Sequence, residues 1–370
     1  MQDPERPLRV LLVGPPTVHL ERARRQLLEL GFEVILVSYD EPHPDAVAHL
    51  ALVSGGQRWK TIWKLGQARR QLARVVRDFQ PDVVHAHWLT GPGWIAALAG
   101  CDPLVVSVWG SDALRWTPQS RVARLLARIV ARRAAAITYD ADVVRDALIA
   151  HGMPGERLVR LVFGIDATRF HPGPPDKALL ATLGVTADGP VVLSPRGLDP
   201  VYQPETVVEA FARIAEPLRA SLLVRVRAGD LDRIRFAALR QLAGTREAAD
   251  RVIPYDSVAD TELPALLRSV DVLVSVPESD GTSVLLLEAL ACGTPVIVSD
   301  LPANREWVTD GAAPIVPVGD KAALADALES VLGTNDARER MLPVSAHVRA
   351  VASTDRQNEA LRSLYSKITQ

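Results

Sequence analysis

The sequence predicts an α/β protein with two domains, each built on a parallel β-sheet that helices cover. Three observations indicate this class. Short runs rich in Val, Ile and Leu alternate with longer helical stretches along the chain, as expected for βαβ units. A chain of 370 residues is too long for one ordinary hydrophobic core. The stretch from Pro172 to Pro190, rich in Pro, Gly and Asp, separates two such series and marks the domain boundary.

The composition argues against several other classes. Hydrophobic residues make up 48% and charged residues 23% of the chain, as in soluble globular proteins. No apolar run reaches the ~18 residues of a membrane span. The polar start leads directly into a strand, so a cytoplasmic protein without a signal peptide is expected. Cys101 and Cys292 lie in apolar contexts and are expected to be reduced, buried thiols.

The charge is shared unevenly between the two halves. Residues 1–170 carry 22 Lys and Arg against 17 Asp and Glu, a net charge of +5. The remainder carries 20 against 27, a net charge of −7, which gives −2 for the chain. A bias of this size does not imply binding to nucleic acid.

The first domain opens with a βαβ unit. A strand from Leu8 to Val13 leads to Gly14, Thr17 or the residues after it open a helix that ends at Gly31, and Phe32 to Ser38 forms the second strand. The turn after the first strand lacks GxGxxG, so a dinucleotide cofactor is not expected. Further strands are expected at residues 82–86, 104–108, 136–139 and 159–162.

Polar and aromatic side chains follow two of these strands. His85, His87 and Trp88 lie at the carboxyl end of the 82–86 strand, and the run from Trp109 to Asp112 follows the 104–108 strand. Ligands of open α/β sheets bind at such strand ends, so these residues predict one wall of a cleft. A zinc site at His85 and His87 is the sharper alternative, although the sequence offers no third ligand.

Two other motifs of the first half have a plain and a functional interpretation. His19, just past the first turn, is either a surface histidine at a helix start or a ligand contact. Asp140 and Asp142 match the DxD pattern of some metal-dependent enzymes. We favour the simpler interpretation, in which they cap a helix from Val143 to His151.

Two helices of the first domain carry basic faces. The first is an amphipathic helix over residues 60–79. The second has four arginines on one side, at intervals of three, four and four: Arg121, Arg124, Arg128 and Arg132. Between Lys60 and Arg133 there are 12 basic and 4 acidic residues. Such faces are usually only solvated, but they also fit docking on an anionic membrane surface.

The second domain repeats the alternation. Strands are expected at residues 190–194, 221–227, 251–253, 272–276, 296–298 and 315–316, with helices between them. A last helix over residues 355–368 has an apolar stripe formed by Leu361, Leu364 and Tyr365.

The stretch from Asp271 to Asp300 concentrates the chemistry of this domain. It predicts a strand, a loop with Asp280 and Gly281, a helix that ends at Gly293, and another strand. A helix that starts from a glycine-bearing loop at a strand's carboxyl end is a natural anion site. Asp280 then lies at the mouth of this site and Glu288 on the helix flank, and the plainer interpretation makes them an N-cap and a surface residue.

These motifs together resemble the GT-B glycosyltransferases of glycosyltransferase family 4, a retaining group that uses nucleotide-sugar donors. The most specific segment, SVPESDGTSVLLLEALACGTPVIVSDLPANREWV, is similar to the family's pair of acids seven residues apart and the segment after it. DVVHAHW, SVWGSD, FGID with FHP, and SPRGL extend the resemblance over essentially the whole chain. The resemblance implies two Rossmann-like, doubly wound domains that face a cleft, with a C-terminal helix that crosses back to the first domain.

The resemblance also implies a division of the chain. Residues 1–172 would form the acceptor-side domain and residues 173–189 a linker. Residues 190–354 would form the nucleotide-sugar-binding domain, and the helix over 355–370 would pack on the N-terminal domain.

Roles for single residues follow from the same resemblance. Asp280 would face the donor sugar beside the reacting carbon, and Glu288 would hydrogen-bond the nucleotide ribose. Arg196 would neutralise phosphate charge as the nucleoside diphosphate leaves, so that Asp280 and Arg196 are the expected catalytic residues. The other expected donor contacts are Gly14, Gly281, Thr282, Ser283 and Val284. The acceptor would dock near His19, His87, Trp109 and Asp112. Apart from a UDP- or GDP-linked donor sugar, no cofactor and no metal are implied.

Three positions depart from the family's pattern. Asp280 stands where the family usually has Glu, which shortens the side chain by one methylene. The segment from Asp199 to Gln203 lacks the Lys that the family usually places after the arginine. Trp109 occupies a place where many relatives have a His near the donor sugar, so that contact would be either lost or replaced by stacking.

The expected activity is transfer of a hexose from a nucleoside-diphosphate sugar to an acceptor hydroxyl, with retention at the anomeric carbon. The expected setting is polysaccharide or lipid-linked glycan assembly, by a protein peripheral to the inner face of the membrane. One alternative is a transferase that makes a small soluble glycoside. Another is a catalytically weak nucleotide-sugar-binding protein, which the missing Lys suggests.

Overall fold

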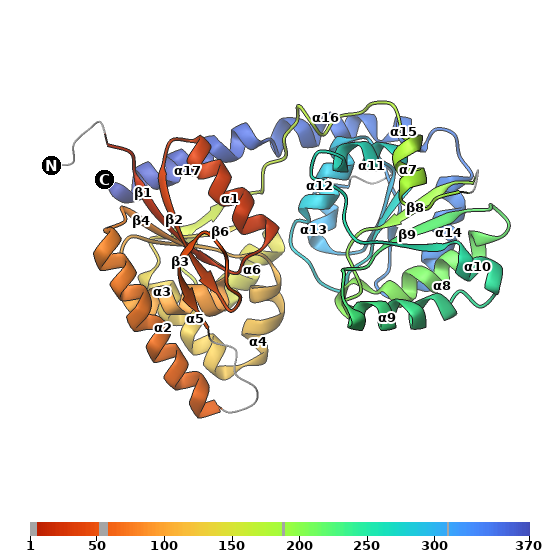
Figure 1. Cartoon of the computed structure of the whole chain (residues 1–370). Coiled ribbons are helices and arrows are strands. Elements are labelled where there is room, and N and C mark those ends of the chain that lie inside the picture. Colours follow the sequence, from red (N-terminus) through yellow and green to blue (C-terminus); the bar gives the residue numbers. More distant parts are fainter. Residues whose placement is uncertain (1–5, 52–57, 187–188, 309–310) are drawn as a thin grey trace. The chain divides into compact units, whose positions relative to one another are not determined.

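The computed structural model describes residues 6–51, 58–186, 189–308 and 311–370 (Figure 1). For residues 58–62 and Gln119 it describes the backbone only, so the Lys60 side chain lies outside the described part. The chain divides into two compact units. Unit 1 comprises residues 1–162 and 355–370, and unit 2 comprises residues 163–354.

Unit 1 is built on a seven-stranded parallel sheet among the described residues, with strand order β3-β2-β1-β4-β5-β6-β7. The strands are β1 (Arg9–Gly14), β2 (Glu33–Tyr39), β3 (Ala46–Leu50), β4 (Val83–His87), β5 (Leu104–Ser107), β6 (Ala136–Tyr139) and β7 (Leu158–Arg160). Its helices are α1 (Val18–Glu29), α2 (Arg58–Phe79), α3 (Trp94–Ala99), α4 (Thr117–Gln119), α5 (Arg121–Arg133), α6 (Asp142–Ala150) and α17 (Thr354–Thr369). Two short π-helical segments are η1 (Leu89–Gly93) and η2 (Asp112–Trp116).

The C-terminal helix completes the core of unit 1. Leu361, Leu364 and Tyr365 of α17 pack with Leu20 and Leu27 of α1 against the buried side chains of the central strands. Gln26 of α1 also donates hydrogen bonds to Gln357 and Asn358. Figure 1 shows α17, in blue, lying against the red and orange elements of unit 1. The predicted packing of the C-terminal helix on the first domain is therefore confirmed.

Unit 2 has a six-stranded parallel sheet among the described residues, in the order β10-β9-β8-β11-β12-β13. Its strands are β8 (Val191–Ser194), β9 (Ser221–Arg225), β10 (Val252–Tyr255), β11 (Val272–Ser275), β12 (Val296–Ser299) and β13 (Ile315–Val316). The helices are α7 (Lys177–Thr182), α8 (Pro204–Ala215), α9 (Asp230–Gln241), α10 (Arg246–Asp250), α11 (Leu263–Ser269), α12 (Val284–Ala291), α13 (Pro302–Arg305), α14 (Lys321–Leu332), α15 (Ala337–Arg340) and α16 (Leu342–Val351), with the 3-10 turn η4 (Pro200–Tyr202).

Each sheet reverses its winding direction at one place. In unit 1 the reversal lies between β1 and β4, and in unit 2 it lies between β8 and β11. Loops leave the two strands in opposite directions at such a point and open a crevice at their carboxyl ends. Sequence segments far apart in the chain meet there, which is why both candidate sites lie at these positions.

The strands expected from the sequence are all present, and their ends lie within two residues of the expected ones. The structure adds β3, at the edge of the unit 1 sheet, and α7 within the expected linker. Asp176 caps α7, and its backbone N–H donates to Ser269 Oγ at 2.6 Å. The segment from Phe163 onward, including these residues, therefore belongs to unit 2.

The two segments that connect the units pair with each other. Ile165 and Ser353 form an isolated parallel bridge. The backbone N–H of Ile165 donates to Ala352, and that of Thr354 donates to Ile165, at 2.8 and 2.9 Å. Among the described residues, no helix combines the length and apolarity needed to cross a bilayer.

Candidate functional site

The candidate donor site in unit 2 centres on an ion pair between Arg196 and Asp280. Arg196 follows β8 and Asp280 follows β11, the two strands at the reversal of the sheet. Arg196 Nη2 lies 2.6 Å from Asp280 Oδ2, and both side chains are mostly buried, with exposed fractions of 18% and 19%. The second guanidinium nitrogen donates to Ser283 Oγ. One arginine fork thus joins both loops that border the crevice.

Ser283, rather than Asp280, caps the helix that follows. Ser283 has extended backbone angles and its side chain accepts a hydrogen bond from the backbone N–H of Leu286, so α12 begins at Val284. Asp280 instead accepts from the N–H of Gly281 at 3.1 Å and from Arg196. The N-cap interpretation of Asp280 is therefore wrong, because its carboxylate is turned toward the arginine.

Tyr202 completes the surroundings of the arginine and was not predicted from the sequence. The Arg196 guanidinium carbon lies 4.5 Å from the centre of the Tyr202 ring, in a cation–π contact. Tyr202 ends η4, within the segment where the family usually has its Lys. This segment is fixed by a hydrogen bond from Glu278 N–H to the Val201 carbonyl at 2.8 Å. An aromatic contact thus occupies the place expected for a second cation.

The electrostatics of the pair are set by burial and by mutual attraction. Burial raises the pKa of the Asp280 carboxyl, while the nearby guanidinium acts in the opposite direction. For Arg196, burial lowers the pKa, but Asp280 and Tyr202 outweigh this effect and the pKa is raised. Arg196 is therefore a cation that stays charged in a poorly solvated crevice.

The other predicted donor residues lie along α12 and its approach. Thr282, Ser283 and Glu288 are all buried, with at most 8% of each exposed. Trp307 covers the start of the helix and its indole N–H donates to Thr282 Oγ1 at 3.3 Å. The surface-residue interpretation of Glu288 is wrong, because this carboxylate lies inside the fold.

In unit 1, Gly14, His87 and Trp109 come together at the carboxyl ends of β1, β4 and β5. A Cβ placed on Gly14 would lie 3.1 Å from His87 Cβ and 3.0 Å from Leu20 Cδ1, so only glycine fits without displacement. The Trp109 ring makes edge-to-face contacts with His87 and His19, at centroid distances of 5.5 and 5.2 Å. The structure thus assembles three of the predicted acceptor-side residues into one aromatic cluster.

Asp112, the fourth of these residues, lies beneath this cluster. It is fully buried, and its two carboxylate oxygens accept the backbone N–H groups of Leu89 and Trp109 at 2.7 and 3.1 Å. Burial raises the pKa of this carboxyl to about 6, against the effect of the N–H donors. Asp112 therefore holds the two loops that follow β4 and β5 in place.

His85 belongs to a buried chain of hydrogen bonds rather than to a metal site. Its Nδ1 lies 2.6 Å from the Tyr365 hydroxyl and its Nε2 lies 2.7 Å from Ser107 Oγ, which in turn contacts Thr138 at 2.7 Å. Within the described ranges, no cluster of three or more His, Cys, Asp or Glu is placed to hold a metal ion. Both ring nitrogens of His85 already have hydrogen-bond partners, which argues against the zinc alternative for this residue.

The DxD motif does not cap α6 as predicted. Ala141 is the N-cap residue and makes no side-chain hydrogen bond, while Asp142 is already helical. The Asp142 carboxylate lies 3.1 Å from Arg145 and 3.4 Å from Arg160, and Asp140 is buried. The cap prediction is wrong, because Asp142 pairs with arginines of its own helix and of β7.

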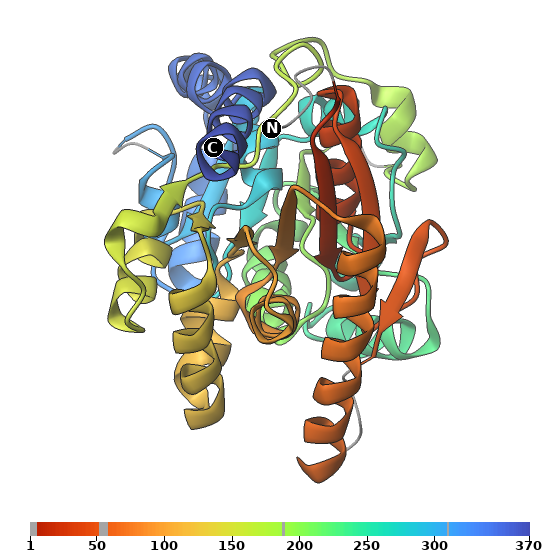
Figure 2. The ribbon, with the colours of Figure 1, turned by 90° about the vertical axis from the view of Figure 1, so that its left-hand side faces the viewer.

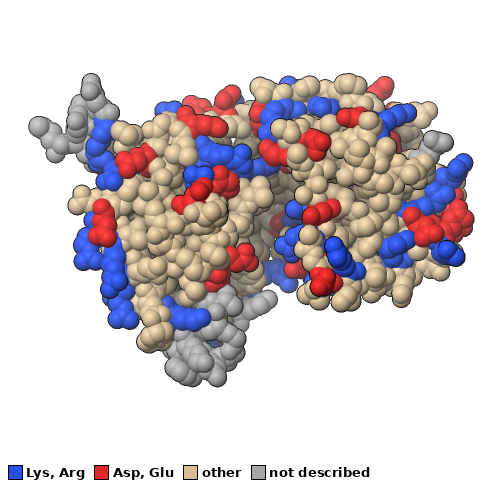
Figure 3. Space-filling model, viewed as in Figure 1, with Lys and Arg blue, Asp and Glu red and all other residues tan. Residues whose placement is uncertain are grey.

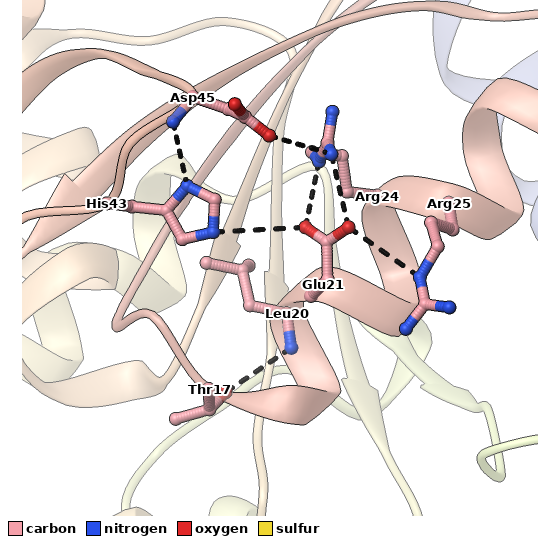
Figure 4. A network of polar contacts seen from close by, with 7 residues as sticks. All are labelled: Thr17, Leu20, Glu21, Arg24, Arg25, His43 and Asp45. Atoms are coloured by element: carbon pink, nitrogen blue, oxygen red, sulfur yellow. Dashed lines mark hydrogen bonds and ion pairs between the residues drawn. The ribbon is translucent and has the colours of Figure 1, made fainter. Parts of the chain in front are cut away.

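A network of charged groups fixes the first turn of α1, which carries His19 (Figure 4). Thr17 caps the helix. Glu21 accepts two hydrogen bonds from Arg24, at 2.9 and 3.1 Å, and Arg24 also pairs with Asp45 at 3.0 Å. His43 lies 4.0 Å from Glu21. The bond from Arg24 lowers the pKa of Glu21, so this carboxylate stays charged and holds Arg24, which ties Asp45 in the segment before β3 to α1.

Comparison with known proteins identifies both units. The family model described as "Glycosyl transferase 4-like" matches residues 9–141, and the model described as "Glycosyl transferases group 1" matches residues 178–343. A D-inositol 3-phosphate glycosyltransferase from Saccharomonospora viridis is 30% identical over 310 residues, covering 78% of this chain and 68% of the relative. The corresponding protein from Geodermatophilus obscurus is 31% identical over 305 residues, covering 77% and 66%.

Solved structures agree on the fold. Sucrose-phosphate synthase from Thermosynechococcus elongatus aligns with a TM-score of 0.80 at 17% identity and covers 98% of this chain and 99% of its own. Anabaena HepE, solved in complex with UDP and glucose, aligns with a TM-score of 0.79 at 17% identity, covering 97% and 100%. At such identities these structures support the GT-B fold and nothing finer. Together with the family models and the sequence relatives, they establish that the chain belongs to glycosyltransferase family 4 and is a glycosyltransferase of GT-B fold.

Proposed function

We propose that the chain moves a hexose from a nucleoside-diphosphate sugar to an acceptor hydroxyl with retention at the anomeric carbon. The observation that carries the proposal is the set of Arg196, Asp280 and Ser283 at the start of α12, where the unit 2 sheet reverses. A buried arginine fork beside a helix N-terminus fits a diphosphate, because both present fixed N–H donors to negative charge.

The proposed chemistry uses charge that the protein supplies itself. When the bond between sugar and diphosphate breaks, negative charge develops on the leaving phosphate. Arg196 and the N–H groups at Thr282, Ser283 and Val284 would stabilise that charge without reorganising. Asp280 would lie beside the sugar and Glu288 would bind the ribose. Gly14 would leave room for the phosphates.

A donor screen tests this proposal. Isothermal titration with UDP-glucose and GDP-mannose measures binding, and release of UDP or GDP measures turnover. We start from UDP because HepE was solved with UDP and with UDP-glucose. We expect one of the two donors to bind and to be slowly hydrolysed when no acceptor is present. If neither UDP-linked nor GDP-linked sugars bind to the protein, the proposal is contradicted.

The acceptor is proposed to come from polysaccharide or lipid-linked glycan assembly. A second candidate, a transferase that makes a small soluble glycoside, is favoured by the relatives that carry the name D-inositol 3-phosphate glycosyltransferase. A third, a weakly catalytic donor-binding protein, is favoured by Tyr202 standing in the segment without a Lys. Formation of a glycosylated product excludes the third, and the identity of that product separates the first two.

A membrane-peripheral location is proposed from the basic helices of unit 1. On α5, Arg121, Arg128 and Arg132 are exposed together with Val122 and Leu125, which are 55% and 58% exposed. Figure 3 shows further Lys and Arg side chains gathered over α2, and Figure 2 shows α2 projecting beyond the sheet. Cations beside exposed aliphatic side chains fit the headgroup region of an anionic bilayer.

Replacing Arg121, Arg128 and Arg132 together by alanine should weaken binding to vesicles of phosphatidylglycerol and phosphatidylcholine by about 100-fold, since each cation contributes about 1 kcal/mol near such a surface. Flotation at several salt concentrations measures this. The matched control replaces Arg233, Arg235 and Arg246 of unit 2, which are also exposed. Equal flotation with neutral and anionic vesicles would refute membrane docking.

Replacing Gly14 by alanine should lower donor turnover by about ten-fold with little change in stability. The new methyl group would press on Leu20, which can rotate, and on the Cβ of His87, which cannot move without its strand. Small displacements in a site reduce rates strongly. The control is Gly66→Ala in α2, where a Cβ meets nothing within 4 Å. Unchanged turnover in Gly14→Ala would place the sugar and phosphates away from this turn.

A further inference from the structure

A continuous chain of aromatic rings lies on the loops after β4 and β5 in unit 1. Trp88 contacts Trp109 and Trp116 at centroid distances of 6.0 and 5.5 Å, and Trp109 continues the chain to His19 and His87. Neighbouring indoles meet at 83° and 79°, so their faces point in different directions. Trp116 is 42% exposed, and Trp88 and Trp109 are half-buried. Trp116 therefore reaches the solvent, and none of the three rings is among the buried side chains of the core.

The backbone of Trp88 is held in an unfavourable conformation. Its φ and ψ of 89° and 134° lie where a residue with a side chain is rarely found. Hydrogen bonds on both sides of the residue fix this conformation. Its N–H donates to the Ser107 carbonyl at 2.9 Å, and its carbonyl accepts from Gly93 at 3.0 Å. Strain of this kind persists where the surrounding structure imposes it, and it is concentrated at functional sites.

Asp112 fixes both tryptophan-bearing loops, through its buried carboxylate and through its backbone carbonyl. Asp112 accepts the N–H groups of Leu89, next to Trp88, and of Trp109 itself. The Asp112 carbonyl accepts the hydroxyl of Thr117, next to Trp116, at 2.6 Å. One buried residue thus holds the backbone at or next to each of the three rings, which positions the rings for contact with a ligand.

A buried polar group lies below the rings. His87 is 2% exposed, and in the part of the chain that the structure describes neither ring nitrogen has a hydrogen-bond partner. Such a group costs free energy unless a partner arrives. Its contact with Trp109 places it next to the aromatic cluster, where a ligand hydroxyl would supply that partner.

We propose that Trp88, Trp109 and Trp116 form the acceptor subsite and that the acceptor is a neutral glycan, whose sugar rings stack on the indoles. The inference rests on the proposed transferase function and specifies its acceptor. A sugar ring offers a C–H face that packs on an indole and hydroxyls at its rim that reach polar groups such as His87. Arg115 lies between these rings in the chain, half-buried, so a phosphorylated acceptor is the alternative to be separated.

Titration of the full chain, followed by tryptophan fluorescence, tests the proposal. The probes are maltotriose and cellotriose as neutral glycans and D-inositol 3-phosphate as the phosphorylated acceptor. We expect a neutral trisaccharide to shift the emission saturably. We expect Trp116→Ala and Trp88→Gly each to weaken its binding about ten-fold. Glycine relieves the strain at position 88, so a loss there reports the missing ring. The control is Trp63→Ala on α2, which is 60% exposed and outside the cluster.

Donor hydrolysis is measured on the same wild-type sample, so that the two proposals fail separately. If the protein neither binds nor turns over the donor but still binds the glycan, the transferase function is overturned. The glycan-binding site on the tryptophans would then still stand. Wild-type affinity in both tryptophan variants would overturn the subsite while the transferase function stands. Binding of D-inositol 3-phosphate without binding of either trisaccharide would also overturn it.

Discussion

Replacing Arg196 by alanine should lower the rate of sugar transfer by about 10³-fold, the loss typical of removing a preorganised group that stabilises transition-state charge. The guanidinium is mostly buried, charged, and bonded to both loops at the reversal of the unit 2 sheet. Because the segment with Tyr202 carries no Lys, Arg196 has no second cation there to replace it. The measurement is the initial rate of nucleoside-diphosphate release.

Two further variants separate charge from geometry. Arg196→Lys keeps a positive charge but loses the fork that reaches Asp280 and Ser283 together, so we expect an intermediate loss of about 10- to 100-fold. The matched control is Arg213→Ala, a half-exposed arginine of α8 that pairs with Asp326 and Glu329. A rate for Arg196→Ala within three-fold of the wild type, in a folded protein, would remove Arg196 from the proposed chemistry.

Stability must be measured beside activity, because Arg196→Ala also leaves the Asp280 carboxylate mostly buried without its cation. We expect a destabilisation of about 3 kcal/mol. In the double variant with Asp280→Ala, most of this stability should return while activity stays absent. Recovery of activity in the double variant would mean that the single variant failed through misfolding alone.

The sequence predicted the positions of these groups because parallel sheets place them by topology. Asp280 and Arg196 follow strands that are distant in the chain, and only the reversal between β8 and β11 makes those strands neighbours. The alternation of apolar strands and helices is enough to predict that reversal once the fold is suspected. The same argument brought His87 and Trp109 together in unit 1, and the structure adds Gly14 to them.

What the sequence did not predict depends on side-chain directions and on local backbone geometry. The choice between Asp280 and Ser283 as the helix cap is decided by where Arg196 can reach, which no local pattern encodes. Asp112 was expected at the acceptor surface, yet it lies below the surface because two backbone N–H groups require an acceptor there. The edge strand β3 is short and half-exposed, so its apolar signal is weak.

The unfolding free energy of unit 1 should fall by about 2 kcal/mol between pH 7 and pH 5 through His85 alone. Burial lowers the pKa of His85 to about 3 in the folded chain, against 6.5 for an ordinary histidine. The unfolded chain therefore binds a proton below pH 6.5 while the folded chain does not, and stability is lost as the pH falls. The pKa of His87 is shifted in the same direction, which makes the total slope steeper.

The variant His85→Gln tests this assignment, since an amide can still bond to Tyr365 and Ser107 but cannot take up a proton. Its stability should depend on pH less steeply than the wild type, by about 2 kcal/mol over the same interval. Urea unfolding followed by tryptophan fluorescence reports on unit 1, because six of the seven tryptophans lie there. The matched control is His347→Gln at an exposed position on α16.

Tyr365→Phe probes the same hydrogen-bond chain from the C-terminal helix. It removes one hydroxyl and leaves His85 Nδ1 buried without that partner, which should cost about 1–3 kcal/mol at pH 7. Because His85, His87 and Trp109 lie in one continuous contact, loosening α17 should also disturb the aromatic cluster. A variant that loses stability but keeps glycan affinity would mean that α17 only supports the fold. Loss of both would make the C-terminal helix a positioning element of the acceptor subsite.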